Sequence, residues 1–596
     1  MALQKREDVK EVDKWDLTPM YASYEDWEKD IQKVTDSVKE VAAFKGRIME
    51  SSSTLYEFYL AYDKMNRISD LVYLYARLLC DGDTTNSEYQ KMKSRVEKMM
   101  EDISTELSFV SSEMLSVDYS TVLGYIKENS KLEEFAFDLE KMFRYKNHTL
   151  SEKEEEIITK ATNAFGTGDE VFYNFDNADI HLGEIINEDG ELEEVTNSNY
   201  IKLMNSKNRQ VRKDAFEHMY HYFESFKNTI SSAYKGQIKE DFFMSDVRKY
   251  PNPLEMSLYR DSIDTSVYKN LISTIHDNLS VMYDYMALRK KALGLEEMHM
   301  YDVYVDIVDA TPADIPFEEG KKILFEALKP LGETYLSDLQ KAFDERWIDK
   351  YPNVGKKSGA YSWGSYDTYP YLLLNYNGTV DSVSTMGHEL GHSMHSYYSN
   401  KYQNSMNANY PIFLAEIAST VNEVLINDYL YKNAKTKEEK MLYLTEFLDK
   451  VRTTIYRQTM FAEFEMIMHD KYEQNIPITE EELSSTYYEL NKLYYGDNMI
   501  SDDLIRYEWL RIPHFYTPFY VYKYATGLSA AIAIASDILK GKDGAKEAYL
   551  EFLRSGCSDY PLNILKKSGV DITTPEPISK AIAMFGEKLK ELQELI

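Results

Sequence analysis

The amino-acid sequence predicts a mainly α-helical protein that is divided into more than one lobe. Apolar residues recur at three- and four-residue intervals over long stretches, with charged residues between them, as is typical of packed amphipathic helices. Segments with the alternating apolar and polar pattern of β-strands are much shorter than these helical stretches. A chain of 596 residues also exceeds the size of an ordinary single core, so we expect two or more lobes.

The N-terminal part of the chain carries clear helical patterns. We predict helices at Thr35–Ser51, Leu55–Cys80 and Ser87–Met114. Ser151, which is followed by acidic residues, predicts the start of another helix. In Ile185–Leu192 an Asp-Gly pair separates short alternating segments, which is the signal of a hairpin. We place a boundary after it, between an N-terminal helical lobe (1–198) and a second domain (199–596).

The charge of the chain restricts its partners. With 68 basic and 100 acidic residues the formal net charge is -32, which repels phosphate backbones and anionic lipid surfaces. We therefore expect neither nucleic acid nor a membrane as a partner. The charge does not identify a substrate, because a strongly acidic surface is also what keeps many proteins soluble.

Cysteine usage and the N-terminal residues predict a cytoplasmic location. Cys80 and Cys557 are the only cysteines, and they form neither a disulfide framework nor a cysteine metal site. The first eight residues lack the apolar core of a secretory signal, and no apolar stretch approaches the roughly 20 residues of a membrane span.

The most informative motif is His388-Glu389-Leu390-Gly391-His392. On a helix, residues i and i+4 lie one above the other with Cβ atoms about 5–6 Å apart, so both imidazoles can reach one metal ion. Glu389 then lies beside the metal, where it could take a proton from a zinc-bound water. The pattern is typical of a zinc peptidase.

A catalytic zinc usually has three protein ligands, so a third must come from elsewhere. The metzincin pattern is excluded, because His395 and Tyr398 occupy the places where it requires Gly and His. A second apolar helix after the Ser399–Pro411 loop offers Glu416, which we predict as the third ligand. Glu423 follows two turns later on the same face, where it could orient a ligand histidine.

The run His514–Tyr524 is rich in groups that can donate hydrogen bonds to a developing oxyanion. An aromatic core segment is the alternative, but so many hydroxyls would each need a buried partner.

Together these motifs resemble oligoendopeptidase F, in the thimet oligopeptidase family of zinc peptidases. The resemblance rests on His388–His395, on Phe413–Glu423 and on His514–Tyr524, with support from Met298–Tyr304 and from Gly359–Tyr376. It implies a prolate, two-lobed, zincin-like metallopeptidase with a small β-sheet beside the active-site helix and a deep central channel. Residues 199–596 would form the catalytic domain.

The resemblance also implies roles for individual residues. His388, His392 and Glu416 would hold one Zn²⁺ per chain, and Glu389 would be the base and proton shuttle. His514 and a tyrosine would stabilise the intermediate. We select Tyr516 and Tyr522 for this role, with Tyr520 and Tyr524 in reserve.

The segment Tyr371–Tyr376 resembles the edge strand along which such enzymes pair the substrate backbone. On this interpretation Tyr371, Leu373 and Asn375 bind substrate. A buried structural strand is an equally good interpretation.

The resulting prediction is a zinc-dependent endopeptidase that hydrolyses internal bonds of short peptides. A zinc carboxypeptidase on a similar helical scaffold is the nearest alternative. A helical binding or scaffold protein with a closed, structural zinc site is another, and it would need a fourth ligand, for which His395 is the obvious local candidate. The sequence does not determine the oligomeric state.

Overall fold

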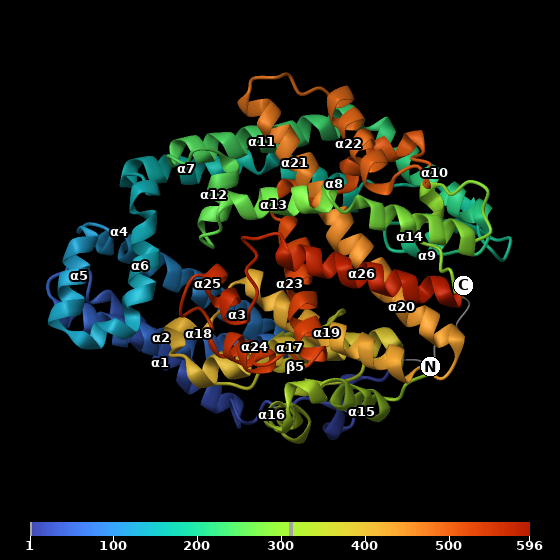
Figure 1. Ribbon diagram of the computed structural model, residues 1–596. Coiled ribbons are helices and arrows are strands. Elements are labelled where there is room, and N and C mark those ends of the chain that lie inside the picture. Colours follow the sequence, from blue (N-terminus) through green and yellow to red (C-terminus); the bar gives the residue numbers. More distant parts are fainter. Residues whose placement is uncertain (1–2, 309–313) are drawn as a thin grey trace. The chain divides into compact units, whose positions relative to one another are not determined.

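The computed structural model describes residues 3–308 and 314–596 and is mainly α, as predicted. It divides into two compact units, and each is assembled from three separate stretches of chain (Figure 1). Unit 1 contains residues 3–147, 314–430 and 534–570, and unit 2 contains residues 148–308, 431–533 and 571–596. The expectation of more than one lobe is confirmed, while the sequence boundary at 198/199 stays a prediction.

Unit 1 combines helices from all three of its stretches. They are α1 (Tyr24–Ala42), α2 (Ser52–Gly82), α3 (Ser87–Glu106), α4 (Phe109–Met114), α5 (Tyr119–Glu128), α6 (Ala136–Arg144), α15 (Phe317–Ala327), α16 (Glu333–Asp344), α17 (Val380–Tyr402), α18 (Ser405–Ala408), α19 (Ile412–Asn433, of which 412–430 belong here), α24 (Ala545–Arg554) and α25 (Pro561–Lys567).

The predicted N-terminal helices are present, with shifted ends. The first begins at Tyr24, well before the predicted Thr35, because the side chain of Ser23 accepts a hydrogen bond from the Asp26 backbone and caps it. The second closely matches the prediction. The third ends at Glu106, and a break at Leu107–Ser108 separates it from α4.

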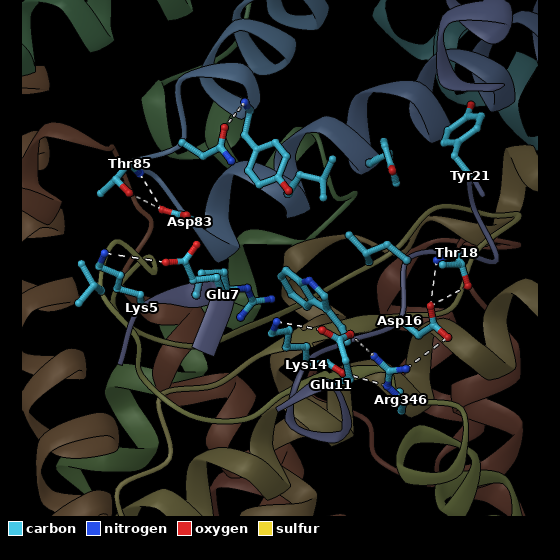
Figure 2. A pocket seen from close by; sticks show the side chains of 18 of the residues that line it. Lys5, Glu7, Glu11, Lys14, Asp16, Thr18, Tyr21, Asp83, Thr85 and Arg346 are labelled. Atoms are coloured by element: carbon cyan, nitrogen blue, oxygen red, sulfur yellow. Dashed lines mark hydrogen bonds and ion pairs between the residues drawn. The ribbon is translucent and has the colours of Figure 1, made fainter. Parts of the chain in front are cut away.

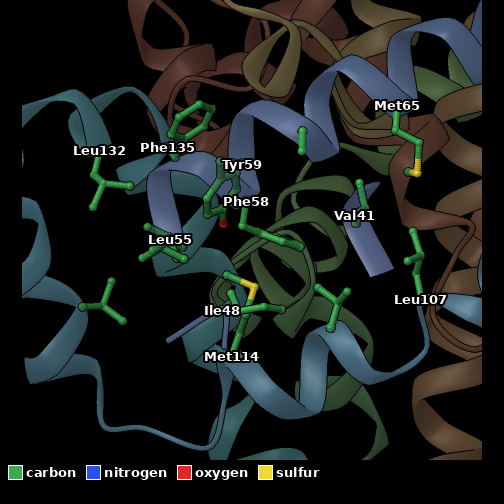
Figure 3. Packing of buried hydrophobic residues seen from close by; sticks show 14 of the residues in the cluster. Val41, Ile48, Leu55, Phe58, Tyr59, Met65, Leu107, Met114, Leu132 and Phe135 are labelled. Atoms are coloured by element: carbon green, nitrogen blue, oxygen red, sulfur yellow. The ribbon is translucent and has the colours of Figure 1, made fainter. Parts of the chain in front are cut away.

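These helices share a buried apolar cluster (Figure 3). Leu55, Phe58 and Tyr59 of α2 lie at its centre, and the rings of Tyr59 and Phe135 stack with centroids 4.5 Å apart. Burial of each such side chain contributes about 1.5–3 kcal/mol, so this cluster holds the N-terminal helices together.

A three-stranded sheet lies beside α17 in unit 1. Strand β5 (Tyr371–Leu373) is in the middle, parallel to β3 (Ile348–Asp349) and antiparallel to β4 (Tyr361–Trp363). The N-terminal segment is tied to this sheet, because Arg6 donates hydrogen bonds to the buried carboxylate of Asp349 (2.8 Å) and to Asn353 (3.2 Å). The predicted small sheet beside the motif helix is confirmed.

The N-terminal segment also borders a cavity of about 800 Å³ in unit 1 (Figure 2). Its charged lining is internally paired: Lys14 donates to Glu11 (3.0 Å), and Arg346 lies 3.7 Å from Asp16. None of the residues that line this cavity belongs to the motifs described above.

Unit 2 is also helical. It contains α7 (Glu152–Phe165), α8 (Thr167–Asn177), α9 (Tyr200–Met204), α10 (Arg209–Ser225), α11 (Lys227–Val247), α12 (Pro253–Tyr259), α13 (Thr265–His276), α14 (Leu279–Ala292), α20 (Lys437–Val451), a π-helical turn η7 (Arg452–Tyr456), α21 (Arg457–Glu473), α22 (Glu480–Tyr495), the 3₁₀ helices η8 (Asp503–Arg511) and η9 (Pro513–Tyr516), the first part of α23 (Tyr522–Leu539) and α26 (Glu576–Leu595).

The predicted hairpin is present in unit 2. Strands β1 (Glu184–Ile186) and β2 (Leu192–Glu194) pair antiparallel, and Gly190 adopts φ 78° in the connecting turn. Ser151 forms a capping box with Glu154 at the start of α7, as its sequence predicted. Within the described residues, no helix is both long and apolar enough to cross a membrane.

Candidate active site

The motif helix α17 packs closely against α19 in unit 1. A Cβ atom on Gly391 would lie 2.6 Å from the Cα of Ser419, so only glycine permits this approach. Near one end of the contact the ring of His392 hydrogen-bonds to the Ala415 carbonyl, and near the other the Asn422 side chain donates to the Gly387 carbonyl (2.9 Å). The contacts pair residues in opposite order along α17 and α19, so the two helices are antiparallel.

This packing brings His388, His392 and Glu416 together. One ligand atom from each lies within 4.8 Å of the other two. The two Nε2 atoms are 3.2 Å apart, and Oε2 of Glu416 lies 3.5 Å from Nε2 of His388 and 3.7 Å from Nε2 of His392. The side chain of Glu416 is 43% exposed, so it is less buried than its apolar neighbours had suggested.

The donor set and its spacing fit a zinc ion. Zinc in proteins takes imidazole nitrogens and carboxylate oxygens at about 2.0–2.1 Å in a tetrahedral arrangement, so two donors on one ion lie about 3.3–3.4 Å apart. The three separations here, 3.2, 3.5 and 3.7 Å, are close to that value. Three protein ligands would leave a fourth position for water or substrate.

Hydrogen bonds to the other ring nitrogens orient the two histidines. Nδ1 of His388 donates to Oε1 of Glu423 at 2.8 Å, and His392 donates to the backbone carbonyl of Ala415. Both rings therefore direct Nε2 toward Glu416. Burial lowers the pKa of His392 to about 3, so its ring is neutral and able to bind a metal.

Glu389 lies next to this cluster and is only 7% exposed. Burial raises the pKa of its carboxyl to about 7, and this rise is opposed by the charge of His388 and by a hydrogen bond from the Ser362 backbone. Ser362 belongs to β4, which packs against α17, and its hydroxyl lies 2.8 Å from that of Ser393. A pKa near neutrality suits a general base.

The prediction of an edge strand at Tyr371–Tyr376 is wrong. Strand β5 lies between β3 and β4, so hydrogen-bond partners occupy both of its edges, and the side chains of Tyr371 and Leu373 are buried in an apolar cluster. Asn375 donates from its side chain to the carbonyls of Lys357 (3.0 Å) and Gly359 (2.7 Å) and thereby holds the loop before β4. The buried structural strand is the correct alternative, and β4 is an edge of this sheet.

His514 lies in unit 2, where its side chain contacts Tyr524, one of the two alternative tyrosines of the sequence prediction. Its Nε2 is 3.1 Å from the hydroxyl of Tyr524, and its ring stacks with that of Tyr520. Burial, assisted by the charge of Arg457, lowers the pKa of His514. Its ring is therefore held toward the neutral form.

The roles of Tyr516 and Tyr522 as hydrogen-bond donors to an oxyanion stay predictions. Both hydroxyls are buried and have no hydrogen-bond partner among the described residues. Tyr516 stacks on Phe172, and Tyr522 packs against Tyr268 in the core of unit 2. Between Tyr516 and Tyr522 the chain passes through Phe519 at φ 54°, a left-handed conformation.

His395 is not part of the ligand cluster. Its ring is fully buried, stacks on Tyr410 with centroids 3.6 Å apart, and has no hydrogen-bond partner among the described residues. A closed structural zinc site would need a fourth ligand, and among the described residues His395 does not join His388, His392 and Glu416 in this role.

Sequence analysis missed the groups that orient the site. Ser362 and Ala415 act through backbone atoms, which leave no signature in residue type, and Asn422 directly follows the buried Val421 on α19. Asn422 is one of several polar residues on this helix, so its residue type alone did not single it out.

Comparison with known proteins identifies the family. The pattern of peptidase family M3 matches residues 202–584, and that of oligopeptidase F matches residues 113–181. Oligopeptidase PepF of Bacillus subtilis is 41% identical, over 100% of this chain and 89% of its own length. Group B oligopeptidase PepB of Streptococcus agalactiae is 38% identical, over 99% of this chain and 98% of its own.

Solved structures agree with this assignment. A Chlamydophila abortus protein is 36% identical with a TM-score of 0.93, and the match covers 100% of both chains. Oligoendopeptidase F from Enterococcus faecium is 33% identical with a TM-score of 0.73, over 96% of this chain and 99% of its own. The chain therefore belongs to peptidase family M3 and is a metallo-endopeptidase.

Proposed function

We propose that the protein is a zinc-dependent endopeptidase that hydrolyses internal bonds of short oligopeptides, with one Zn²⁺ per chain. The observation that carries the proposal is the convergence of His388, His392 and Glu416 at separations suited to tetrahedral zinc, with the buried carboxyl of Glu389 next to them. The names of the related oligopeptidases support the substrate class. The wider relation to thimet oligopeptidase belongs to the same proposal.

His388, His392 and Glu416 would hold the metal, and Glu423 would keep His388 in the tautomer that presents Nε2. When bound, zinc supplies Lewis acidity, which makes a water more acidic and a peptide carbonyl more electrophilic. All further steps are assigned to side chains of the protein.

Glu389 takes the proton from the attacking water and later delivers it to the leaving amine. Its carboxyl is suited to both roles, since a pKa of about 7 lets it hold or release a proton near neutral pH. The hydrogen bond from the Ser362 backbone holds the carboxylate in place.

His514 and Tyr524 are proposed to donate hydrogen bonds to the oxyanion of the tetrahedral intermediate, with Tyr520 beside them. This assignment rests on the resemblance of the His514–Tyr524 run to the family and on the hydrogen bond between the two side chains.

The substrate backbone is proposed to pair with β4 in place of β5. Strand β4 is an edge of the sheet, its residues are half-buried, and its Ser362 contacts Glu389. A peptide added to this edge would gain main-chain hydrogen bonds that do not depend on its side chains.

The remaining proposals come from the sequence. The catalytic domain is proposed to span 199–596, after an N-terminal helical lobe at 1–198, and a cytoplasmic location remains a prediction from cysteine usage.

Glu389→Gln tests the mechanism. The variant should bind one zinc per chain like the wild type, because the metal ligands are unchanged, and should lose activity by about 10²- to 10⁴-fold, the range for removal of a general base. Asp381→Asn, which changes an exposed carboxylate on the same helix, is the matched control and should keep full activity. Full activity of Glu389→Gln with zinc bound would refute the assignment of the base.

A further inference from the structure

A π-helical turn in unit 2 places two arginines on one face. The backbone N–H of Arg457 donates to the carbonyl of Arg452, five residues earlier, at the junction of η7 and α21. The wider turn brings residues five apart nearer to the same side than an ordinary α-helix does, in which they lie about 140° apart. Such π-turns are rare and frequently mark functional sites.

Both guanidinium groups lie in the interior of unit 2. The residue Arg452 is only 2% exposed, and the Arg457 side chain is 18% exposed. The guanidinium of Arg452 lies 5.3 Å from the ring centre of Tyr304. The charges of both arginines act on the buried Tyr495, so the two cations share one polar neighbourhood.

The carboxylates of this region do not balance its arginines. Arg452 donates through Nε to Asp449 (2.9 Å), but Asp449 also receives the fully buried Arg289 (3.1 Å). Arg457 donates to Glu508 (2.7 Å), whose charge acts on Arg511 as well. With Asp176, which also acts on Arg511, three carboxylates of the described chain thus serve four guanidinium groups.

One donor of Arg452 is left without a partner. Its Nη1 is buried and forms no hydrogen bond with any described residue. A buried donor without an acceptor is destabilising, and a neighbouring like charge adds to that cost. An anion is the simplest group that would satisfy the donor and offset the excess positive charge.

We propose that unit 2 binds a small monovalent anion, with chloride as the simplest occupant, at Nη1 of Arg452 beside Arg457, Tyr304 and Tyr495. The shared chemistry is a compact single negative charge, which chloride or a carboxylate can supply. An anion at this position would also counteract the field of Arg457 at His514, so its occupancy would bear on the group proposed to stabilise the oxyanion.

The first test is thermal unfolding of the wild-type protein at constant ionic strength, with chloride, acetate or the bulky anion gluconate. Chloride should raise Tm in a saturable manner relative to gluconate, because a ligand that binds only the folded state stabilises it. A parallel rise in acetate would show that the site also takes carboxylates. Identical Tm values in chloride and gluconate would overturn the proposal.

Variants locate the site. Arg452→Met should abolish the chloride response, and Arg452→Lys should retain it at higher half-saturation, because the charge remains. Arg248→Met is the matched control, since Arg248 is a partly exposed arginine of the same unit paired with Glu155 (3.0 Å), and it should respond like the wild type. An Arg452→Met protein with an unchanged chloride response would contradict the assignment.

A direct measurement does not depend on the folding of any variant. In ³⁵Cl NMR, the wild-type protein should broaden the chloride signal more than weak surface binding does. Millimolar bromide should displace the bound chloride and remove this additional broadening. No competable broadening would refute the proposal. None of these measurements requires catalytic activity, so failure of the proposed peptidase mechanism would not be mistaken for failure of the anion site.

Discussion

Nδ1 of His388 donates a hydrogen bond to Oε1 of Glu423 across the contact between α17 and α19, at 2.8 Å. The bond fixes the ring so that Nε2 faces Nε2 of His392 and Oε2 of Glu416. Glu423 of α19 thus orients His388, and Glu416 of the same helix is proposed to bind the metal together with His388. This arrangement predicts that loss of Glu423 will weaken the metal site without removing a ligand.

Glu423→Gln should lower zinc affinity by about 10- to 100-fold, because the neutral amide holds the imidazole less strongly. Activity should fall at limiting zinc and recover when zinc is added. Competition with a chromophoric chelator measures the affinity. Glu326→Gln, a change at an exposed carboxylate of α15, should bind zinc like the wild type. Equal affinities for Glu423→Gln and the wild type would show that the hydrogen bond has no role in metal binding.

Tyr524→Phe should lower kcat by about 10²-fold with little change in KM, the effect expected on losing one donor to an oxyanion. Tyr522→Phe is the internal control, because the Tyr522 hydroxyl is buried and cannot reach a substrate in this conformation. It should keep kcat within about threefold of the wild type, since the change removes no donor from the reaction. Steady-state kinetics on one quenched peptide compares the two variants. A larger loss of kcat in Tyr522→Phe than in Tyr524→Phe would support Tyr522, which the sequence had selected, as the donor.

Glu465 makes stability depend on pH. The residue is 1% exposed, its Oε1 accepts a hydrogen bond from the Phe519 backbone (2.7 Å), and burial raises its pKa from 4.5 to about 8. Above pH 4.5 the unfolded chain releases this proton, whereas the folded protein keeps it until about pH 8. The folded state therefore loses stability as pH rises through this window, by at most about 1.4 kcal/mol per pH unit.

Glu465→Gln removes this titration and can keep the hydrogen bond to Phe519. Its Tm should exceed that of the wild type by a margin that grows between pH 5 and pH 8. Glu473→Gln, at an exposed position of the same helix, should show a constant difference from the wild type over the same range. A constant margin for Glu465→Gln as well would mean that Glu465 is already ionised in the folded protein at pH 5.

Local spacing predicted much of the candidate site. The i, i+4 histidines and the two-turn separation of Glu416 and Glu423 depend only on helix geometry, and the structure brings these four side chains together. Helical character was equally predictable, because long amphipathic stretches carry a strong periodic signal.

Features that depend on distant parts of the chain were not predictable. The middle position of β5 is set by pairing with β3 and β4, and three-residue strands carry no signal for their neighbours. The contact between His514 and Tyr524, at 3.1 Å, depends on the path of the chain between them, which passes through the left-handed Phe519. The two units combine separated stretches, which no local pattern reveals.

The central claim is that the protein cleaves internal peptide bonds with the help of a metal ion, which His388, His392 and Glu416 would hold. The most direct measurement is cleavage of a short internally quenched peptide, blocked at both ends, before and after removal of metal by a chelator and again after zinc is restored. The account predicts cleavage that is lost with the metal and recovered with zinc at one ion per chain. Cleavage that persists in the metal-free protein, or no cleavage across a varied peptide set with one zinc bound, would contradict it.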